Sequence, residues 1–309
     1  KRSAAMYAFY NKQKNLINKN IIINFGKNWF NNRINKVSMG FEPVYTLNQK
    51  LSLLPEKFNS NNFNIAFFVS SQDEIDVLEG LKNKISQIQI IEHISKSFNL
   101  GIDIYVRIHP NLHKNDMNFL SDLENLKKYK NITIIRADEK IDTYNLIRNS
   151  DLTITVASTV GVESSYLQTR SILFGSSLYE KFDCVDIVKS KKELINIIKD
   201  SIRTELSVME KKKRADNACI YAWSLMNYGV ESKNYFKTNY YEGYMLKNNK
   251  KYKIRANLMY IIINRVIDFP LSLFIVLKLF FKNPYNYLNK SFWNYQSFKK
   301  IFFSNIPRR

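Results

Sequence analysis

Cysteine is scarce in this chain: Cys184 and Cys219 are the only two among 309 residues. Two cysteines so far apart make neither a disulfide framework nor a metal cluster. Acidic residues with the spacing of metal ligands are also missing, so we expect no bound metal and no other cofactor. These absences favour a reducing compartment and exclude the small secreted proteins that disulfides hold together.

The sequence also lacks a signal-peptide pattern, and it begins with Lys1 rather than Met. One interpretation is that it begins inside a longer natural chain. The hydrophobic share of 45% and the aromatic share of 14% are typical of a globular protein and exclude a disordered one. A chain of 309 residues can bury one large core or two moderate ones.

Acidic residues are nearly absent from the C-terminal part. Residues 246–309 carry thirteen Lys or Arg residues and one acid, Asp268, which places +12 of the formal net charge of +20 in this segment. Such a charge attracts anionic lipid, an acidic polymer or nucleic acid. Because no nucleic-acid-binding motif is present, we expect an anionic membrane surface as the partner of residues 246–309, and no nucleic acid.

No uninterrupted hydrophobic span is present either. Residues 257–281 have the length of a membrane span, but Arg265, Asp268 and Pro270 interrupt them. We interpret them as amphipathic or interfacial helices, with a true span or a helix that closes over the core as alternatives. Residues 285–303 mix aromatic residues with lysines, as in a lipid headgroup layer. We therefore expect a cytoplasmic protein, peripheral at the inner face of the cell membrane.

From residue 64 onward, apolar runs alternate with helical patterns. The sequence predicts strands at 64–71, 102–108, 131–137, 151–158, 170–175 and 184–188, and helices at 78–98, 115–129, 142–149, 159–168 and 191–202. The strands are almost continuously apolar, which is typical of strands buried on both faces. The alternation therefore predicts an α/β fold, with a Rossmann-type parallel sheet and helices on both faces.

The segments on either side of this pattern are less regular. Residues 1–20 fit a helix, and 21–25 fit either a short strand or part of a buried helix. We expect residues 1–60 to be a remnant of an N-terminal domain or a link to one. We expect residues 61–205 to form a Rossmann-like domain and 206–309 to form a helical, basic region that ends in the amphipathic helices.

Polar residues lie at the end of, or directly after, each of the first five predicted strands. They are Ser70, Ser71, Asp73 and Glu74 at the first strand, Arg107 and His109 at the second, Arg136 at the third, Ser158, Thr159, Gly161 and Glu163 at the fourth, and Ser176 and Tyr179 at the fifth. In a parallel sheet these loops share the carboxyl edge, where ligands of such sheets bind. The sequence thus predicts a polar ligand site at this edge.

Two of these loops suggest a phosphate site. A helix begins directly after Ser158 and Thr159, so its N–H groups and these two hydroxyls could hold an anion, while Glu163 could accept from sugar hydroxyls. The alternative is an ordinary N-cap with an acid in the first turn. His109 could donate to a phosphate oxygen, with Pro110 bracing the backbone.

Asp73 and Glu74 could act as a general base or bind substrate hydroxyls. The alternative is that they cap the helix that follows. Ser70, Ser71, Arg136, Ser176 and Tyr179 are candidates for contacts with the nucleotide or sugar, and Arg107 is a candidate for contact with the phosphate.

The segments FFVSSQDE, YVRIHPN and IDTYNLIRNSDLTITVASTVGVESSYLQTRSILFGSSLYE resemble the donor-binding half of bacterial GT-B glycosyltransferases of capsule and surface-polysaccharide assembly. The His-Pro element and the later Ser/Thr pair are similar to those of sialyltransferases, Kdo transferases and CDP-glycerol polymerases. The resemblance implies that His109, Ser158 and Thr159 hold the phosphate of a CMP- or CDP-linked donor, and that Glu163 binds ribose. A UDP-linked donor stays open.

GT-B enzymes have a second Rossmann-like half, which often carries the catalytic base, whereas only residues 1–60 precede the matched half here. The first domain is outside this sequence, is reduced, or belongs to another chain. The resemblance implies a transferase that moves a sugar from a nucleotide-activated donor to a growing polysaccharide or glycolipid. Two alternatives are a nucleotide-sugar 2-epimerase of the same fold and a non-catalytic, membrane-docked partner subunit that binds nucleotide.

Overall fold

The computed structural model describes residues 2–37, 45–71, 75, 86–98, 100–110, 112 and 117–228, together with the backbone of 236–239, 242–247 and 250–253. The chain divides into two compact units, Lys1–Tyr228 and Gly229–Arg309. Residues 257–281 and 285–303, which we expect to form amphipathic helices, lie outside the described residues.

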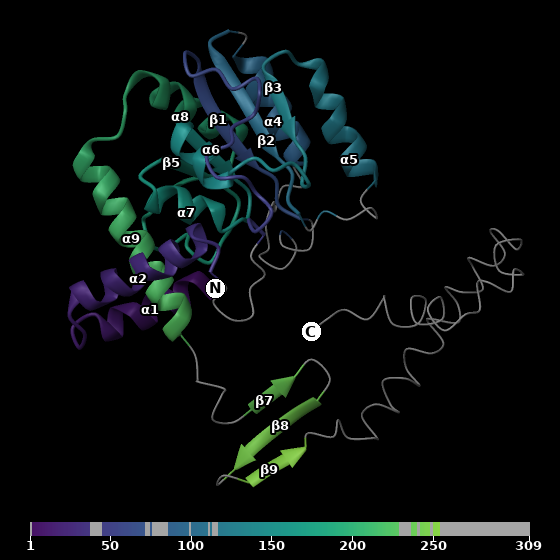
Figure 1. Cartoon of the computed structure of the whole chain (residues 1–309). Coiled ribbons are helices and arrows are strands. Elements are labelled where there is room, and N and C mark those ends of the chain that lie inside the picture. Colours follow the sequence, from purple (N-terminus) through teal and green to yellow (C-terminus); the bar gives the residue numbers. More distant parts are fainter. Residues whose placement is uncertain are drawn as a thin grey trace, which may run out of the picture. The chain divides into compact units, whose positions relative to one another are not determined.

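The first unit is built on a sheet of six parallel strands in the order β3-β2-β1-β4-β5-β6 (Figure 1). The strands are β1 (Phe63–Phe68), β2 (Ile102–Arg107), β3 (Ile132–Ile135), β4 (Leu152–Thr155), β5 (Arg170–Phe174) and β6 (Asp186–Val188). Each overlaps one of the six predicted strands. The α/β class and the parallel Rossmann-type sheet are therefore confirmed.

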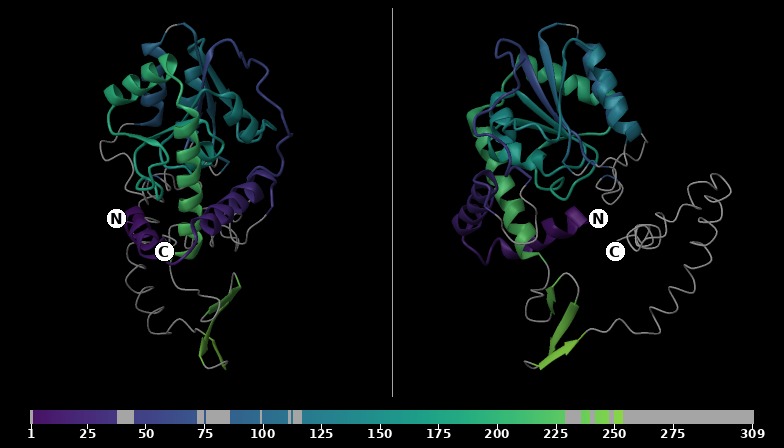
Figure 2. Two further views of the ribbon diagram at one scale, coloured as in Figure 1. Left: turned by 90° about the vertical axis from the view of Figure 1, so that its left-hand side faces the viewer. Right: turned by 45° about the vertical axis from the view of Figure 1, so that its right-hand side comes forward.

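Helices cover both faces of this sheet (Figure 2). The described helices of the unit are α1 (Arg2–Gln13), α2 (Lys19–Ile34), α4 (Gln87–Ser97), α5 (Met117–Glu124) with the 3₁₀ turn η2 (Asn125–Lys128), α6 (Thr143–Asn149), α7 (Val160–Tyr166), α8 (Lys191–Arg203) and α9 (Val208–Asn227). Residues of α4, η2 and α8 pack on one face. Residues of α6 and α7 pack on the other, together with α1, α2 and α9.

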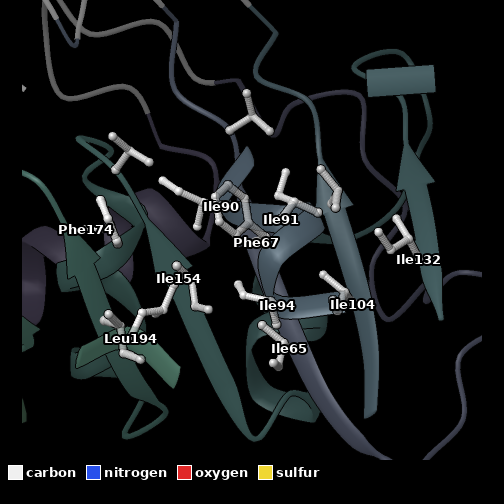
Figure 3. Close-up of a cluster of buried hydrophobic side chains, with 14 of the residues drawn as sticks. Ile65, Phe67, Ile90, Ile91, Ile94, Ile104, Ile132, Ile154, Phe174 and Leu194 are labelled. Carbon is white, nitrogen blue, oxygen red and sulfur yellow. The ribbon is translucent and has the colours of Figure 1, made fainter. Parts of the chain in front are cut away.

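The packing of the core explains why the sequences of these strands are almost continuously apolar. Ile65 and Phe67 of β1 point toward α4, where they meet the fully buried Ile90, Ile91 and Ile94 (Figure 3). The intervening residues of β1 point to the opposite face and are buried as well. Burying each such side chain contributes about 1.5–3 kcal/mol, so both faces of β1 stabilise the fold.

The first sixty residues pack into the same unit as the sheet. Residues 21–25, for which the sequence left two alternatives open, belong to the helix α2. This helix lies against α9 so closely that a Cβ at Gly26 would clash with the backbone of Cys219. Because α9 extends to Asn227, the compact unit ends at Tyr228, which differs from the boundary at residue 205 that we expected.

The second unit contains a three-stranded antiparallel sheet in the order β7-β8-β9, formed by Phe236–Asn239, Glu242–Lys247 and Lys250–Lys253. The sequence analysis predicted helix over this range. This prediction is wrong, because the short polar and aromatic segments of these strands carry no clear period that separates them from the helical pattern upstream.

Candidate functional site

The strand order reverses between β1 and β4, since the chain runs outward to β2 and β3 on one side and to β5 and β6 on the other. In sheets of this kind, ligands bind at the carboxyl ends of the strands where the order reverses. The polar loops predicted from the sequence follow these strand ends. The fold therefore brings the loops after β1, β2 and β4 to one edge of the sheet.

Ser70 ties the two central strand ends together. Its backbone N–H donates to Oε1 of Gln87 (2.9 Å), and its carbonyl accepts from Nε2 of the same side chain (2.8 Å). Its Oγ accepts from the backbone N–H of Ala157, which follows β4, at 3.2 Å. Ser70 is fully buried. It therefore fixes the loop after β1 against the loop after β4 and the start of α4.

Two polar atoms at this edge are buried without a hydrogen-bond partner among the described residues. They are Oγ of Ser71, just beyond β1, and Nη1 of Arg107, the last residue of β2. The two strands are neighbours, with Phe68 paired to Arg107. An unpaired buried polar atom costs about 1–3 kcal/mol, so its presence in a stable fold calls for an explanation, such as a ligand.

Arg107 is only 4% exposed. Its Nη2 donates to the carbonyl of Glu139 at 3.0 Å. Burial lowers the pKa of Arg107 from its ordinary value, while the negative charges of Glu139 and Asp138 oppose that shift. Because a guanidinium stays protonated in proteins, Arg107 keeps its positive charge at neutral pH.

His109 is half-buried and lies against Tyr45, with ring centroids 5.3 Å apart and ring planes at 64°. Tyr45 belongs to a coil that is fastened to the loop before α6. In this coil, Lys50 N–H donates to the Lys140 carbonyl (2.8 Å), and Gln49 Oε1 accepts from Thr143 N–H (2.9 Å). Tyr45 was not among the predicted site residues, because nothing in the pattern of residues 45–60 places it beside β2.

The loop after β4 is internally bonded. Val160 N–H donates to Ser158 Oγ (3.3 Å), Gly161 N–H to the Ser158 carbonyl (3.3 Å), and Val162 and Glu163 N–H to the Thr159 carbonyl (3.1 Å each). The first N–H groups of α7 are thus already paired. A phosphate at this helix end would have to displace the Ser158 hydroxyl, so the loop resembles the N-cap alternative more than an open anion site.

Glu163 is buried, and both of its carboxylate oxygens accept hydrogen bonds from other residues of the protein. Its Oε1 accepts from Nη2 (3.0 Å) and Nε (3.2 Å) of Arg33 and from Oγ1 of Thr159 (3.1 Å), and its Oε2 accepts from the Tyr144 hydroxyl (3.0 Å). Burial, and then the nearby charge of Glu163, raises the pKa of Tyr144 well above its usual range. Glu163 therefore joins α2 and α6 to α7, and a ribose hydroxyl would add to or compete with these bonds.

Arg33 is the second residue that the sequence analysis missed. It lies on α2, 130 positions before Glu163, and its guanidinium also stacks over the Trp29 ring at 4.7 Å. No local pattern indicates such a contact.

Tyr179 supports the loop after β4 from inside. It is fully buried, and its hydroxyl donates to the Ser158 carbonyl at 2.7 Å and lies 3.3 Å from Thr155 Oγ1. Burial raises the pKa of Tyr179 well above its usual range. A Cβ at Gly161 would clash with this hydroxyl, so glycine is needed there. In this structure Tyr179 braces the loop rather than lining an open site.

The remaining predicted residues are placed as follows. Ser176 is half-buried after β5, beside Gly175, whose φ is +138°. Arg136 is exposed, and its Nε pairs with Glu124 at 3.1 Å on α5. Asp73 and Glu74 lie outside the described residues. The structure thus brings Ser70, Ser71, Arg107, His109, Ser158 and Thr159 to the carboxyl edge, while Arg136 turns to a surface ion pair.

Within the described part of the chain, no group of three or more His, Cys, Asp and Glu side chains could hold a metal ion. No described helix combines the length and the apolarity that crossing a bilayer requires. Cys184 and Cys219 are both buried free thiols, and burial raises the pKa of each to about 12.

No family model and no curated protein matches this sequence. Among solved structures, the chain is similar to KpsC of Thermosulfurimonas dismutans, a beta Kdo 2,4 transferase, with 16% identity and a TM-score of 0.40 over 75% of this chain and 60% of that one. It is also similar to HepE of Anabaena in complex with UDP and glucose, with 14% identity and a TM-score of 0.36 over 52% of this chain and 44% of that one. A third similar structure is the UDP-GlcNAc 2-epimerase of Neisseria meningitidis bound to UDP-GlcNAc, with 15% identity and a TM-score of 0.40 over 55% of this chain and 44% of that one.

The chain spans 60% of the length of KpsC and 44% of each of the other two. At such identities the likeness concerns the fold. The strand order and the polar carboxyl edge by themselves define a Rossmann-type α/β protein with a candidate ligand site where the strand order reverses.

Proposed function

We propose that this chain carries the donor-binding half of a glycosyltransferase that takes a sugar from a CMP-, CDP- or UDP-linked donor. The observation that carries the proposal is a pair of buried polar atoms without a hydrogen-bond partner among the described residues, Ser71 Oγ and Arg107 Nη1, at the ends of neighbouring strands. A phosphate offers acceptor oxygens to both atoms. The resemblance of the sequence to donor-binding halves of GT-B glycosyltransferases supports the same assignment.

Arg107 and His109 stabilise the leaving group in this proposal. As the bond between sugar and phosphate breaks, negative charge builds on the phosphate of the nucleotide. A cation that is already oriented and shielded from water stabilises that charge without reorganising. Arg107 meets this requirement because it is buried, charged and held by the Glu139 carbonyl.

Ser70, Ser158 and Thr159 shape the site around the phosphate. Ser70 holds the loops after β1 and β4 together through Gln87 and Ala157. Thr159 directs its hydroxyl proton to Glu163, so it can only accept a further hydrogen bond in this arrangement. We therefore assign the donor contacts to Ser71, Arg107 and His109, and a supporting role to Thr159.

The acceptor in this proposal is a growing surface polysaccharide or glycolipid, and Asp73 or Glu74 serves as the general base. Their support is their place in the sequence, two and three residues after Ser71. We place the reaction at the inner face of the cell membrane. The unpaired thiols of Cys184 and Cys219 and the basic residues 246–309 are consistent with that location.

A panel of CMP, CDP, UMP, UDP and GDP in a thermal-shift assay tests the donor site. We expect at least one nucleotide to raise the melting temperature, and His109→Ala and Arg107→Met to abolish the shift. The control is His93→Ala, because His93 lies on α4, about 9 Å along the helix axis from Gln87, which contacts Ser70. Binding is expected to persist in EDTA. If no nucleotide stabilises the protein, the proposal fails.

Incubation with UDP-GlcNAc and no acceptor separates transferase from epimerase. A transferase leaves the sugar unchanged, whereas an epimerase forms the 2-epimer without an acceptor. Nucleotide binding with no turnover on any donor and acceptor pair would instead identify a non-catalytic partner subunit.

A further inference from the structure

The N-terminal helices carry an unbalanced charge. Residues 1–41 contain eight Lys or Arg residues and no Asp or Glu. Five of these basic residues are exposed on α1, on α2 or in the turn between them, and none makes an ion pair with another described residue: Arg2, Lys12, Lys14, Lys19 and Lys27. These five side chains therefore give the surface of α1 and α2 a positive charge that no ion pair among the described residues neutralises.

Apolar side chains stand exposed on the same surface. Leu16, in the turn between α1 and α2, is 77% exposed, and Ile21, in the first turn of α2, is 61% exposed. Phe25 follows Ile21 by four positions on α2, on the same side of the helix, and is 37% exposed. We call residues 12–25, which hold these side chains together with Lys12, Lys14 and Lys19, the α1–α2 tip.

These apolar residues are not part of the interface of α2 with the rest of the unit. That interface is formed by a separate set on the other side of the helix: Ile22, Ile23, Gly26, Trp29 and Phe30. Scattered exposed apolar residues are normal on protein surfaces. Here they alternate with unpaired lysines over a short stretch, which is the composition of segments that lie in a lipid headgroup layer.

Charge decides which partner fits the tip. A second copy of this chain would bring the same positive surface to the contact, and residues 246–309 carry +12 of their own. An anionic lipid surface offers both negative headgroups for the lysines and an apolar layer for Leu16 and Ile21. We propose that the α1–α2 tip docks on an anionic lipid surface, with Leu16 and Ile21 entering the headgroup layer.

Docking through the tip orients the candidate donor site. The helix α2 runs from Lys19 near the tip to Arg33, a distance of about 21 Å along its axis. Arg33 bonds to Glu163, which also holds Thr159 at the carboxyl edge of the sheet. A continuous helix and a partly buried ion pair thus connect the docked tip to the loop after β4. This inference does not depend on the proposed function.

Co-sedimentation of the full chain with vesicles tests the charge component. We compare vesicles of phosphatidylcholine and phosphatidylglycerol in equal parts with vesicles of phosphatidylcholine alone. Replacing Lys12, Lys14 and Lys19 with serine is expected to weaken binding to the anionic vesicles by about fivefold for each lysine. The matched control replaces Lys130, Lys192 and Lys199, which lie before β3 and on α8, away from α1 and α2 (Figure 1).

A polarity-sensitive dye tests insertion and separates the tip from residues 246–309. The dye is attached to cysteine in Leu16→Cys, while Cys184 and Cys219 stay unlabelled because they are buried. We expect a blue shift with anionic vesicles and none with phosphatidylcholine alone. Leu100→Cys is the control, since Leu100 is 92% exposed and precedes β2 at the amino edge.

Three results would overturn the proposal. The first is equal vesicle binding by the tip variant and the control variant. The second is a dye at Leu16→Cys that does not respond to anionic vesicles. The third is binding of a single-stranded oligonucleotide that requires Lys12, Lys14 and Lys19 in a protein that does not bind vesicles.

Discussion

Ser70 Oγ accepts a hydrogen bond from the backbone N–H of Ala157 at 3.2 Å, across the point where the strand order reverses. The two residues are 87 positions apart. Their bond joins the ends of β1 and β4, the two central strands of the sheet. The geometry of the carboxyl edge therefore depends in part on this buried hydroxyl, together with the bonds of Gln87 to Ser70 and of Tyr179 to Ser158.

Ser70→Ala is expected to lower the free energy of unfolding by about 1–3 kcal/mol, because it leaves the buried N–H of Ala157 without its acceptor. Urea denaturation measures this loss. The matched control is Ser201→Ala, which removes a hydroxyl that donates to the Ile197 carbonyl within α8 and leaves no buried N–H unpaired. Equal losses for the two variants would argue against a linking role for Ser70.

Arg107→Met is expected to leave the free energy of unfolding unchanged or to raise it by about 1 kcal/mol, while nucleotide affinity falls at least about tenfold. The reason is that Nη1 of Arg107 is buried without a hydrogen-bond partner in the part of the chain that the structure describes, so an apolar side chain of similar length removes a desolvation cost. Chemical denaturation and nucleotide titration measure the two effects. A site built to bind a ligand shows this trade of stability for function.

The contrasting variant is Arg170→Met. Arg170 is paired with Asp186 at 2.8 Å and with Asp200 at 3.0 Å. Its loss leaves the mostly buried Asp186 with one partner fewer, and we expect the free energy of unfolding to fall by about 3 kcal/mol with nucleotide affinity unchanged. If Arg107→Met destabilised the protein as much as Arg170→Met does, Arg107 would be a structural residue.

Glu163→Gln is expected to lower the free energy of unfolding by about 2 kcal/mol, because a neutral amide replaces the carboxylate that Arg33 and Tyr144 hold. A double-mutant cycle with Arg33→Met measures the coupling between α2 and α7. The predicted ribose contact is tested separately, by comparing the affinities for CMP and 2′-deoxy-CMP.

Both oxygens of Glu163 are already used by the protein, so we expect Glu163→Gln to leave the ratio of those two affinities unchanged. A preference for CMP that the variant loses would show that Glu163 releases one of its present partners to bind ribose.

The stability of the protein is expected to fall at acidic pH because of Asp186. Burial alone would raise the pKa of Asp186, but hydrogen bonds and charges of Arg214 and Arg170 hold it below its ordinary value of 3.8. A carboxyl whose pKa is lower in the folded than in the unfolded state stabilises the fold at pH values above its unfolded-state pKa. This stabilisation is lost as the pH falls through the folded-state pKa. Denaturation midpoints measured from about pH 6 downward should therefore decline below about pH 5.

In Asp186→Asn the midpoint should be lower at neutral pH and should decline less on acidification. Asp122→Asn, an exposed position on α5, should follow the wild type. An unaltered pH profile in Asp186→Asn would assign the acid sensitivity to other carboxylates.

The sheet could be predicted because its strands are buried on both faces. β1 and β4 consist almost entirely of buried residues, and burial on both faces requires the continuous apolar runs that the sequence shows. The carboxyl-edge loops followed from the same pattern, since parallel strands place their ends together. The antiparallel strands at 236–253 were mistaken for helix, because their short polar and aromatic segments carry no clear period.

The site itself could be predicted only in part. Ser70, Arg107 and His109 follow predicted strands, so their common edge was predictable. Arg33 and Tyr45 come from the N-terminal segment, and they reach Glu163 and His109 through packing of α2 and of the coil before β1. Contacts over such separations leave no periodic trace in the sequence.

The sequence by itself determined the α/β class, the number and direction of the core strands, and the edge where polar residues gather, because burial and chain direction are written in local patterns. Only the tertiary structure decided which of those polar residues have hydrogen-bond partners within the protein. Glu163 and Tyr179 have their partners within the protein, while Ser71 Oγ and Arg107 Nη1 are buried without one among the described residues. Hydrogen-bond satisfaction depends on atoms brought together from distant segments, and residue types alone do not specify it.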